Sequence, residues 1–427
     1  MLNNINENKT YKKFYELDHY ERLEYIQKKN QLSDNDIKLL KEIPDSFKFD
    51  IINRMIENAI GLYPLPLGIA TNFLIDGKEY DIPMVTEEPS IIAAASKAAK
   101  IAKINGGFIT NVDESIMIGQ IQLINFKLSI TETINIILDK KSEILNIANT
   151  KSKNVIAQDL QVKIVDDESN NKIGAMIIIE LIVDTKDAMG ANIINTMCEN
   201  VSVFIENITN GEVVLKILSN YSTKRISRCK AIFSKDEIGG EKIVDRILAA
   251  YSFAYSDVFR AVTHNKGIMN GIDSVAIATG QDFRALEASS HAYACKDGKY
   301  RSLTKWSKNN DGDLVGEIEI PIAVGIVGGI TSVHPFAKLA LKILGVNSAK
   351  ELSSILCSVG LAQNFSAIRA LASEGIQKGH MKLHAKNIAV TAGAIGNNEI
   401  EKIAEQMIKE GNISVNRARE IIKMDNR

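Results

Sequence analysis

Four polar side chains of types that enzymes use together lie between residues 260 and 294: Arg260, Lys266, Asn270 and Asp282. Three glycines and a short apolar run, residues 275–278, lie among them, and we expect this run to be buried. Charged groups that flank a buried segment are typical of sites where charge must be held in place. A positioned Lys266 ammonium would stabilise negative charge that develops on a carbonyl oxygen.

Asp282 permits two interpretations. It follows the turn Thr279-Gly280, directly after the apolar run 274–278. If that run is a strand, Asp282 lies in a loop at the strand end, which is a favoured place for catalytic residues. It could equally cap the N-terminus of a following helix.

Glu88 lies just before a predicted helix. The segment EEPS, residues 87–90, leads into the alanine-rich SIIAAASKAAKIAKI, which ends at the glycine pair 106–107. Proline in the first turn and glycine past the end are typical of a helix. Glu88 is therefore either a simple cap or an acid–base group. A helix N-terminus lowers the pKa of a carboxyl group, so a catalytic Glu88 needs burial or a second carboxylate to raise its pKa.

His380 follows Gly379 in GHMKLH, and His384 lies four residues further on. This spacing could suit a metal, but the segment lacks the glutamate of HExxH and no third ligand is apparent. We therefore expect no metal. A histidine in a stretch whose glycines permit hinge motion suits the role of a proton donor.

The segment DAMGAN, residues 187–192, connects a predicted buried strand to a helix N-terminus. Backbone amides and the positive end of the helix form an anion site there, as a dinucleotide's phosphates require. The chain contains no GxGxxG, which disfavours a Rossmann domain. The glycines of GIVGG, residues 325–329, could bring backbone close to a ligand or simply form a turn.

Composition indicates an ordinary globular protein of two or three domains. The chain has 427 residues, 45% of them hydrophobic, and a formal net charge of −1, so no general field attracts nucleic acid or anionic lipid. The four cysteines form no CxxC pair, and we expect free thiols. The first residues are polar and lack the apolar run of a signal peptide, so we expect none, and the apolar stretch 320–330 is shorter than the about 20 residues that span a bilayer. We expect a cytoplasmic protein with no membrane contact.

The chain pattern predicts an α+β protein. A helical arm over residues 1–50 precedes strands around an Asp76-Gly77 hairpin. From about 108 to 218 the pattern changes to helix 130–147, a strand in NVIAQDLQVKIV, a fully buried strand in KIGAMIIIELIVD and a helix after DAMGAN. This segment looks like a compact α+β domain inserted into a larger one. A helical tail begins near residue 375.

The candidate residues lie in blocks that resemble those of class II hydroxymethylglutaryl-CoA reductases, in the same order. The blocks are ENAIG, TEEPS, GGF, MIGQ, DAMGANIINTM, ILSN, THNKGIMNGID, TGQDFRALEA, GLAQN and GHMKLHAKN. They extend from about residue 55 to residue 390. The resemblance implies a two-step, four-electron, reversible reduction of 3-hydroxy-3-methylglutaryl-CoA (HMG-CoA) to mevalonate and CoA by two NAD(P)H.

The resemblance also implies roles for single residues. The catalytic residues would be Glu88, Lys266, Asp282 and His380. Asp282 would lie close to Glu88 and Lys266 and raise the pKa of Glu88. The substrate-binding residues would be Arg260, Ser90, Asn270, Asn220 and Gln363. The cofactor-binding residues would be Asp187, Met189, Gly190, Asn192 and Asp159.

The resemblance further implies an architecture. Residues 1–108 and 217–374 would form a large mixed α/β domain that binds the CoA substrate. Residues 109–216 would form an inserted, smaller, ferredoxin-like α+β domain that binds the dinucleotide, and 375–427 a C-terminal helical flap. The active site would lie at the interface of a homodimer, which could assemble further.

One departure from the family bears on the cofactor. Family members often carry GGG before an Arg-Asp pair, and the same place here is NVIAQD, residues 154–159. Asp159 would favour NADH, whereas Lys151 and Lys153 would favour the 2′-phosphate of NADPH. We favour NADPH because two lysines outnumber one aspartate. Two other functions remain: a non-catalytic CoA- or nucleotide-binding protein, and a single-step hydroxy-acid dehydrogenase.

Overall fold

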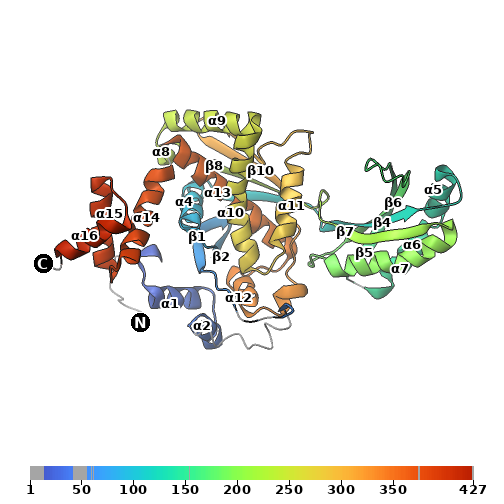
Figure 1. Cartoon of the computed structure of the whole chain (residues 1–427), viewed down its shortest axis with the longest axis horizontal. Coiled ribbons are helices and arrows are strands. Elements are labelled where there is room, and N and C mark those ends of the chain that lie inside the picture. Colours follow the sequence, from blue (N-terminus) through green and yellow to red (C-terminus); the bar gives the residue numbers. More distant parts are fainter. Residues whose placement is uncertain are drawn as a thin grey trace, which may run out of the picture.

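The computed structural model describes residues 14–41, 55–58, 60, 62–152, 154–373 and 376–425. The chain forms two β-sheets with helices packed around each (Figure 1). The two sheets have separate hydrophobic cores. The predicted mixture of helices and strands is confirmed.

The first sheet has six strands in the order β2-β1-β3-β8-β10-β9. Only β1 and β3 pair in parallel. The predicted hairpin connects β1 and β2, and its two turn residues, Asp76 and Gly77, both have positive φ, as a type I′ turn requires. The strands are β1 Leu67–Ile75, β2 Lys78–Val85, β3 Phe108–Val112, β8 Ile226–Phe233, β9 Thr304–Lys308 and β10 Leu314–Pro321.

Helices α4, α10 and α13 pack on this sheet and on one another. Gly271 of α10 and Gly360 of α13 lie where these two helices meet, and a Cβ at either would press on the other helix. Helix α13 is long and apolar enough to cross a membrane, but 72% of that window is buried, so it is a core helix here. The helices around the first sheet are α4 Ile91–Ile104, α8 Lys235–Ile238, α9 Glu241–Ser256, α10 Val258–Ala278, α11 Phe283–Tyr293, α12 Pro335–Leu344 and α13 Ala349–Ala372.

The second sheet has four antiparallel strands in the order β5-β6-β4-β7. The chain enters it directly after β3 and leaves it just before β8 (Figure 1). Helix α7 packs on β4 and β7 and, with α5 and α6, completes the core. The elements are β4 Ile116–Ile124, α5 Ile130–Asp139, α6 Lys141–Ala148, β5 Ile156–Val165, β6 Met176–Asp184, α7 Ala191–Thr209 and β7 Glu212–Ser219.

Two expectations for this segment are wrong. The single helix 130–147 is two helices that meet at Lys140, and Ile137 and Ile144 on either side of the break both reach the core. Strand β6 is not buried throughout, because burial alternates along its first half. The physical reason is that helices cover only one face of an antiparallel sheet, so the other face meets solvent.

The two ends of the described chain pack as predicted helical segments. Helix α2 Asp34–Lys41 packs on α12, and Leu23 and Ile26 of α1 His19–Lys29 belong to the same hydrophobic cluster as Ile343 of α12. Helices α14 Ile376–Ala392, α15 Asn397–Glu410 and α16 Val415–Asp425 form a core of their own. This three-helix group and the second sheet lie at opposite ends of the molecule (Figure 1).

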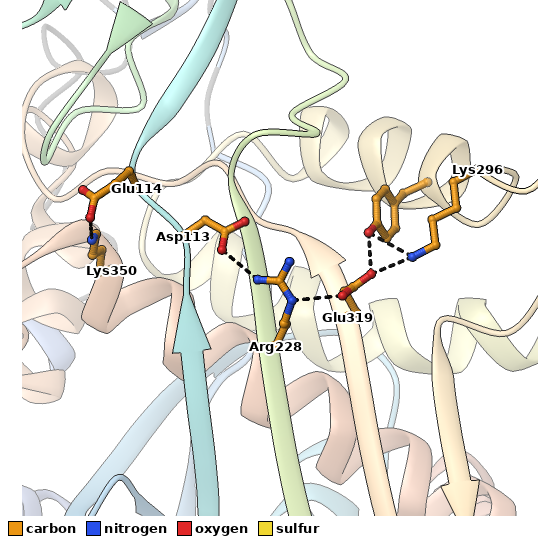
Figure 2. Close-up of polar contacts among 7 residues, drawn as sticks. Asp113, Glu114, Arg228, Lys296, Glu319 and Lys350 are labelled. Carbon is orange, nitrogen blue, oxygen red and sulfur yellow. Dashed lines mark hydrogen bonds and ion pairs between the residues drawn. The ribbon is translucent and has the colours of Figure 1, made fainter.

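Ion pairs join neighbouring strands of the first sheet close to the point where the chain passes into the second sheet. Arg228 of β8 binds Asp113 at 2.7 Å and Glu319 of β10 at 2.9 Å, and Glu319 also binds Lys296 at 2.6 Å (Figure 2). Although burial raises the pKa of Glu319, hydrogen bonds from Lys296, Tyr293 and Arg228 lower it to about 2. The charges lie on the polar face of the first sheet, whereas Cys229 between them faces the core.

Candidate active site

Three of the predicted site residues meet at the start of α4 and the middle of α10. Lys266 Nζ lies 3.2 Å from Glu88 Oε2, and Asn270 Nδ2 lies 3.5 Å from the same oxygen. Lys266 and Asn270 are four residues apart, so they share one face of α10. The Lys266 side chain is 61% exposed, and an ion pair this open contributes little to stability. Its ammonium is therefore accessible to a ligand.

Glu88 is held by the turn before α4 and does not cap the helix. Its backbone N–H donates to Thr86 Oγ1, and Ser90 is the residue that begins the helix. The interpretation of Glu88 as a simple cap is wrong, because its recorded partners are Lys266 and Asn270.

Ser90 has an unusual backbone for a helix start. Its φ of 77° is left-handed, which costs a residue other than glycine about 1 kcal/mol or more, and its hydroxyl forms no capping hydrogen bond. Because the helix end does not engage the Ser90 hydroxyl, this group is available for a ligand.

Asp282 caps helix α11. Its Oδ1 accepts a hydrogen bond from Ala285 N at 3.1 Å, and Arg284 lies 3.5 Å away. The strand-end interpretation is wrong, because residues 274–278 form the end of α10, where all but the half-buried Ile277 are buried. Val275, Ala276 and Ala278 are buried as expected.

Within one chain, Asp282 does not lie beside Glu88 and Lys266. The helix rises about 18 Å between Lys266 and Ala278, at about 1.5 Å per residue, and Asp282 comes after that end. Among the described residues, no hydrogen bond or ion pair joins Asp282 to Glu88 or Lys266. The expected contact therefore does not form in a single subunit.

The predicted substrate-binding residues lie on several elements. Gln363 of α13 is buried against Gly271, one residue from Asn270, and its Oε1 has no hydrogen-bond partner among the described residues. Arg260 lies in the first turn of α10, where burial lowers its pKa. Asn220 directly follows β7 and is exposed. Gln363 thus adjoins the Glu88–Lys266–Asn270 group through Asn270.

The DAMGAN segment connects β6 to the N-terminus of α7, as predicted. Gly190 begins α7 with a φ of 97° and without a side-chain cap, so the first amides of the helix are open to a ligand. Met189 is half-buried and Asn192 is exposed. The Asp187 carboxylate, however, accepts from Ala349 N at 2.8 Å and so caps α13.

Sequence reasoning missed how this segment is held in place. Arg225, 1% exposed, donates to Thr185 Oγ1 at 3.1 Å, to the Ala188 carbonyl at 3.3 Å and to the Val324 carbonyl. Burial lowers the pKa of Arg225 to about 10, so it remains charged at neutral pH. Arg225 lies between β7 and β8, and a lone arginine in the sequence gave no signal for this role.

A second connection runs from the segment to Asp282. Gln281 bonds both the N–H and the carbonyl of Gly325, each at 2.9 Å. A Cβ on Gly325 would overlap the backbone of Asp187 and Met189. Gly325 thus brings two stretches of the protein's own backbone into close approach, which neither interpretation of its glycine-rich run had predicted.

Other predicted groups are placed only in part. Asp159 of β5 pairs with Lys141, whose hydrogen bond lowers the pKa of Asp159. Lys153 and the side chain of Lys151 lie outside the described residues, and so does the side chain of His380, although its backbone belongs to α14. All four cysteines are free, as expected. In the described part of the chain, no three metal-binding side chains cluster.

The chain matches known proteins over most of its length. The family model described as hydroxymethylglutaryl-coenzyme A reductase matches residues 18–385. The 3-hydroxy-3-methylglutaryl-coenzyme A reductase of Archaeoglobus fulgidus is 50% identical, over 96% of this chain and 93% of its own. A probable reductase of Borreliella burgdorferi is 39% identical, over 79% of this chain and 78% of its own.

Solved structures agree with the sequence comparison. The reductase of Streptococcus pneumoniae superposes with a TM-score of 0.80 at 37% identity, covering 97% of this chain and 99% of its own. A second structure, described as the class II enzyme of S. pneumoniae bound to NADPH in open conformations, gives a TM-score of 0.79 and covers 84% of this chain and 99% of its own. The resemblance seen in the motifs is thus confirmed, and the chain belongs to the hydroxymethylglutaryl-coenzyme A reductase family.

Proposed function

We propose that the chain reduces HMG-CoA to mevalonate and CoA at the site formed by Glu88, Lys266 and Asn270. The accessible ion pair between Lys266 and Glu88 is the observation that carries the assignment. Lys266 would stabilise the oxyanion that forms on the thioester carbonyl, since a fixed ammonium stabilises charge that develops there. Glu88 would supply a proton to the mevaldehyde carbonyl, and His380 would protonate the departing CoA thiolate.

The substrate-binding residues would surround this group. Arg260 would pair with the free carboxylate of the hydroxymethylglutaryl group, because arginine suits carboxylate recognition. The unpartnered Gln363 Oε1 and the free Ser90 hydroxyl offer further polar contacts, together with Asn270 and Asn220.

We assign the dinucleotide to the second sheet, as an inserted ferredoxin-like domain that was predicted over residues 109–216 and whose strands extend from Ile116 to Ser219. Its β-α-β-β-α-β pattern and its strand order support this assignment. The open amides at the start of α7 fit a pyrophosphate, so residues 187–192 would hold the cofactor and Asp159 would lie near its ribose. When bound, a reduced nicotinamide would supply one hydride, so the two reductions would use two nicotinamides in turn. Residues 1–108 and 217–374 would form the substrate domain, and 375–427 a flap in a cytoplasmic enzyme.

NADPH is the cofactor that we expect to be preferred. Asp159 is already engaged by Lys141, which leaves it less free to bind a ribose hydroxyl. A similar enzyme has been solved with NADPH bound. Steady-state kcat/KM should be higher with NADPH than with NADH, and each CoA released should consume two nicotinamides. A preference for NADH above about tenfold, or about 1.4 kcal/mol, would contradict this assignment. A single nicotinamide oxidised without CoA release would favour a simple dehydrogenase.

The separation of Lys266 and Asp282 supports a homodimer with shared active sites. If both residues act on one substrate, two chains are favoured as their source, because α10 rises about 18 Å between Lys266 and Ala278 and Asp282 comes after that end. A two-fold dimer would bring Asp282 of one copy to Lys266 of the other and form two equivalent sites. Apolar side chains next to Arg260 are exposed and could be covered in such a dimer, namely Val258, Phe259 and Val262.

A complementation experiment tests this arrangement. Lys266→Ala and Asp282→Asn subunits, each inactive alone, are co-expressed with different tags, and the mixed dimers are purified and assayed. A shared site predicts that mixed dimers recover about half of the wild-type activity, because one of their two sites contains both intact residues. If each site belongs to one chain, the mixed dimers should stay inactive. In sedimentation, an active monomer would also contradict the dimer.

A further inference from the structure

A buried polar network joins α10, α13 and β9 next to the proposed site. Asn364 Nδ2 of α13 lies 3.0 Å from His264 Nε2 of α10. Asn364 Oδ1 accepts hydrogen bonds from Thr304 Oγ1 and from Trp306 Nε1, each at 3.0 Å. Thr304 Oγ1 also lies 2.8 Å from His264 Nε2. All four side chains are buried, so water does not compete for these hydrogen bonds.

The same turn of α10 is held a second time through Asn265. Its Nδ2 donates to the Arg301 carbonyl at 2.8 Å, and its Oδ1 accepts from Leu303 N at 3.0 Å. Asn265 is completely buried and directly precedes Lys266. Two hydrogen bonds to one stretch of backbone give the amide a single orientation. The backbone at Lys266 is therefore fixed against the segment that leads into β9.

On α13 the network lies next to Gln363. Gln363 directly precedes Asn364 and lies against Gly271 of α10, and its Oε1 has no partner among the described residues. The network therefore links the part of α10 that carries Lys266 to the part of α13 that carries Gln363. Apolar contacts bring two helices together without fixing how one is rotated against the other, whereas hydrogen bonds are directional.

Hydrogen-bond chemistry determines where the proton of His264 lies. Trp306 Nε1 can only donate, so the Asn364 atom that faces it is the carbonyl oxygen. The other end of the Asn364 amide is then the NH₂ group, which donates to His264 Nε2. Nε2 is therefore unprotonated, and the neutral imidazole carries its proton on Nδ1. Burial, together with the charge of Arg260, lowers the pKa of His264 to about 3, in agreement with a neutral ring.

This tautomer leaves one donor of His264 without a partner. Nδ1 is buried, and no acceptor among the described residues reaches it. A buried donor without an acceptor lowers the stability of a fold. Stability alone therefore does not explain a histidine here, and its place two residues before Lys266 connects it with the site.

We propose that His264 and Asn364 are positioning residues, because a neutral imidazole that accepts from the amide fixes how α10 and α13 are rotated against each other at the site. This orientation directs Lys266 and Gln363 toward the same substrate. The proposal rests on the proposed roles of these two residues in HMG-CoA reduction. A misplacement of about 1 Å can lower a rate by about a hundredfold, so the network acts on kcat without touching the substrate.

NMR can observe the tautomer directly. In enzyme that carries nitrogen-labelled histidine, His264 should show a protonated Nδ1 and an unprotonated Nε2. Its signals, assigned by their loss in His264→Gln, should not change between about pH 5 and 8, where exposed histidines titrate. Its partners in the network do not titrate, and among the described residues the charge that acts on it is that of Arg260. Signals that titrate in this range, or a proton on Nε2, would overturn the proposal.

Two substitutions of His264 separate positioning from packing. Glutamine places its Oε1 near the position of the imidazole Nε2 and can still accept from Asn364, whereas leucine fills similar space but cannot accept. His264→Gln should keep kcat within about threefold of the wild type, and His264→Leu should lower it by about tenfold to a hundredfold. KM for NADPH should stay unchanged, because residues 187–192 take no part in the network. A folded His264→Leu enzyme with wild-type kcat would overturn the proposal, and so would equal losses in both variants.

Asn364→Asp decides the question if His264→Leu does not fold. The new carboxylate can still accept from Trp306, but it presents an acceptor to His264 Nε2 instead of a donor. The imidazole should move its proton to Nε2 or take up a second one, with a raised pKa, and kcat should fall by about tenfold or more. Asn105→Asp, at an exposed amide after the end of α4, is the control and should change neither. An Asn364→Asp enzyme that keeps either the wild-type tautomer or the wild-type kcat would contradict the proposal.

Failure of this inference differs from failure of the proposed function. If the proposed function is wrong, the wild-type enzyme itself releases no mevalonate from HMG-CoA. If only the positioning role is wrong, the wild type is active and the variants of His264 and Asn364 depart from the expected results. The protonation of His264 is measured in the wild type in either case.

Discussion

Replacing Lys266 by alanine should lower kcat by about 10²–10³-fold or more, equivalent to about 3–4 kcal/mol of transition-state stabilisation. The reason is that Lys266 supplies the positive charge at the proposed site, paired at 3.2 Å with Glu88. The fold should survive, because the side chain is 61% exposed and supports no core contact. Steady-state kinetics and calorimetric titration with HMG-CoA measure the two effects separately.

The matched control is Lys242→Ala, which removes an exposed lysine from α9. We expect this variant to retain wild-type kcat and Kd. If Lys266→Ala keeps more than about a tenth of the wild-type kcat, its activation free energy has risen by less than about 1.4 kcal/mol. That result would rule out the oxyanion role.

Replacing Arg225 by alanine should lower the free energy of unfolding by about 3–5 kcal/mol, which is the usual cost of breaking a buried charged network. Arg225 is buried between β7 of the second sheet and β8 of the first. It donates hydrogen bonds to Thr185 Oγ1 and to the carbonyls of Ala188 and Val324. Removing it leaves those carbonyls without their donor in a buried place. Because Ala188 belongs to the proposed cofactor segment, KM for NADPH should rise as well.

Urea denaturation followed by circular dichroism measures the loss. Arg246→Ala, at an exposed position on α9, is the control and should change the free energy of unfolding by less than about 0.5 kcal/mol. Arg225→Lys keeps the charge but offers fewer donors, so its stability should lie between the wild type and Arg225→Ala. An Arg225→Ala protein as stable as Arg246→Ala would show that the arginine does not hold the segment.

Residue types and local patterns predicted several features that the structure bears out. The Asp76-Gly77 turn, the helix after Pro89 and the helix N-terminus at Gly190 were predictable because backbone geometry at turns and helix ends depends on a few neighbouring residues. The motif blocks indicated the family because their residue types and their order along the chain match it. Side chains such as Lys266 and Asn270 are four residues apart on one helix, so their shared face is a local property.

Local pattern failed where burial depends on distant partners. The apolar run before Asp282 suits a strand or a helix equally well, and only packing of α10 on α13 and β2 makes it helical. Glu88 resembled a cap because its partners, Lys266 and Asn270, are about 180 residues away in the chain. Strand β6 looked buried on both faces, but helices cover only one of them.

The sequence by itself therefore determined the family, the turns, most of the helices and the identity of the groups that could carry the chemistry. Tertiary structure alone decided which of these groups meet. It joined Glu88 to Lys266 and buried Arg225 between the strands. It also separated Lys266 from Asp282 along a rigid helix. The physical reason is that local conformation depends on neighbouring residues, whereas a contact between distant residues depends on how whole elements pack.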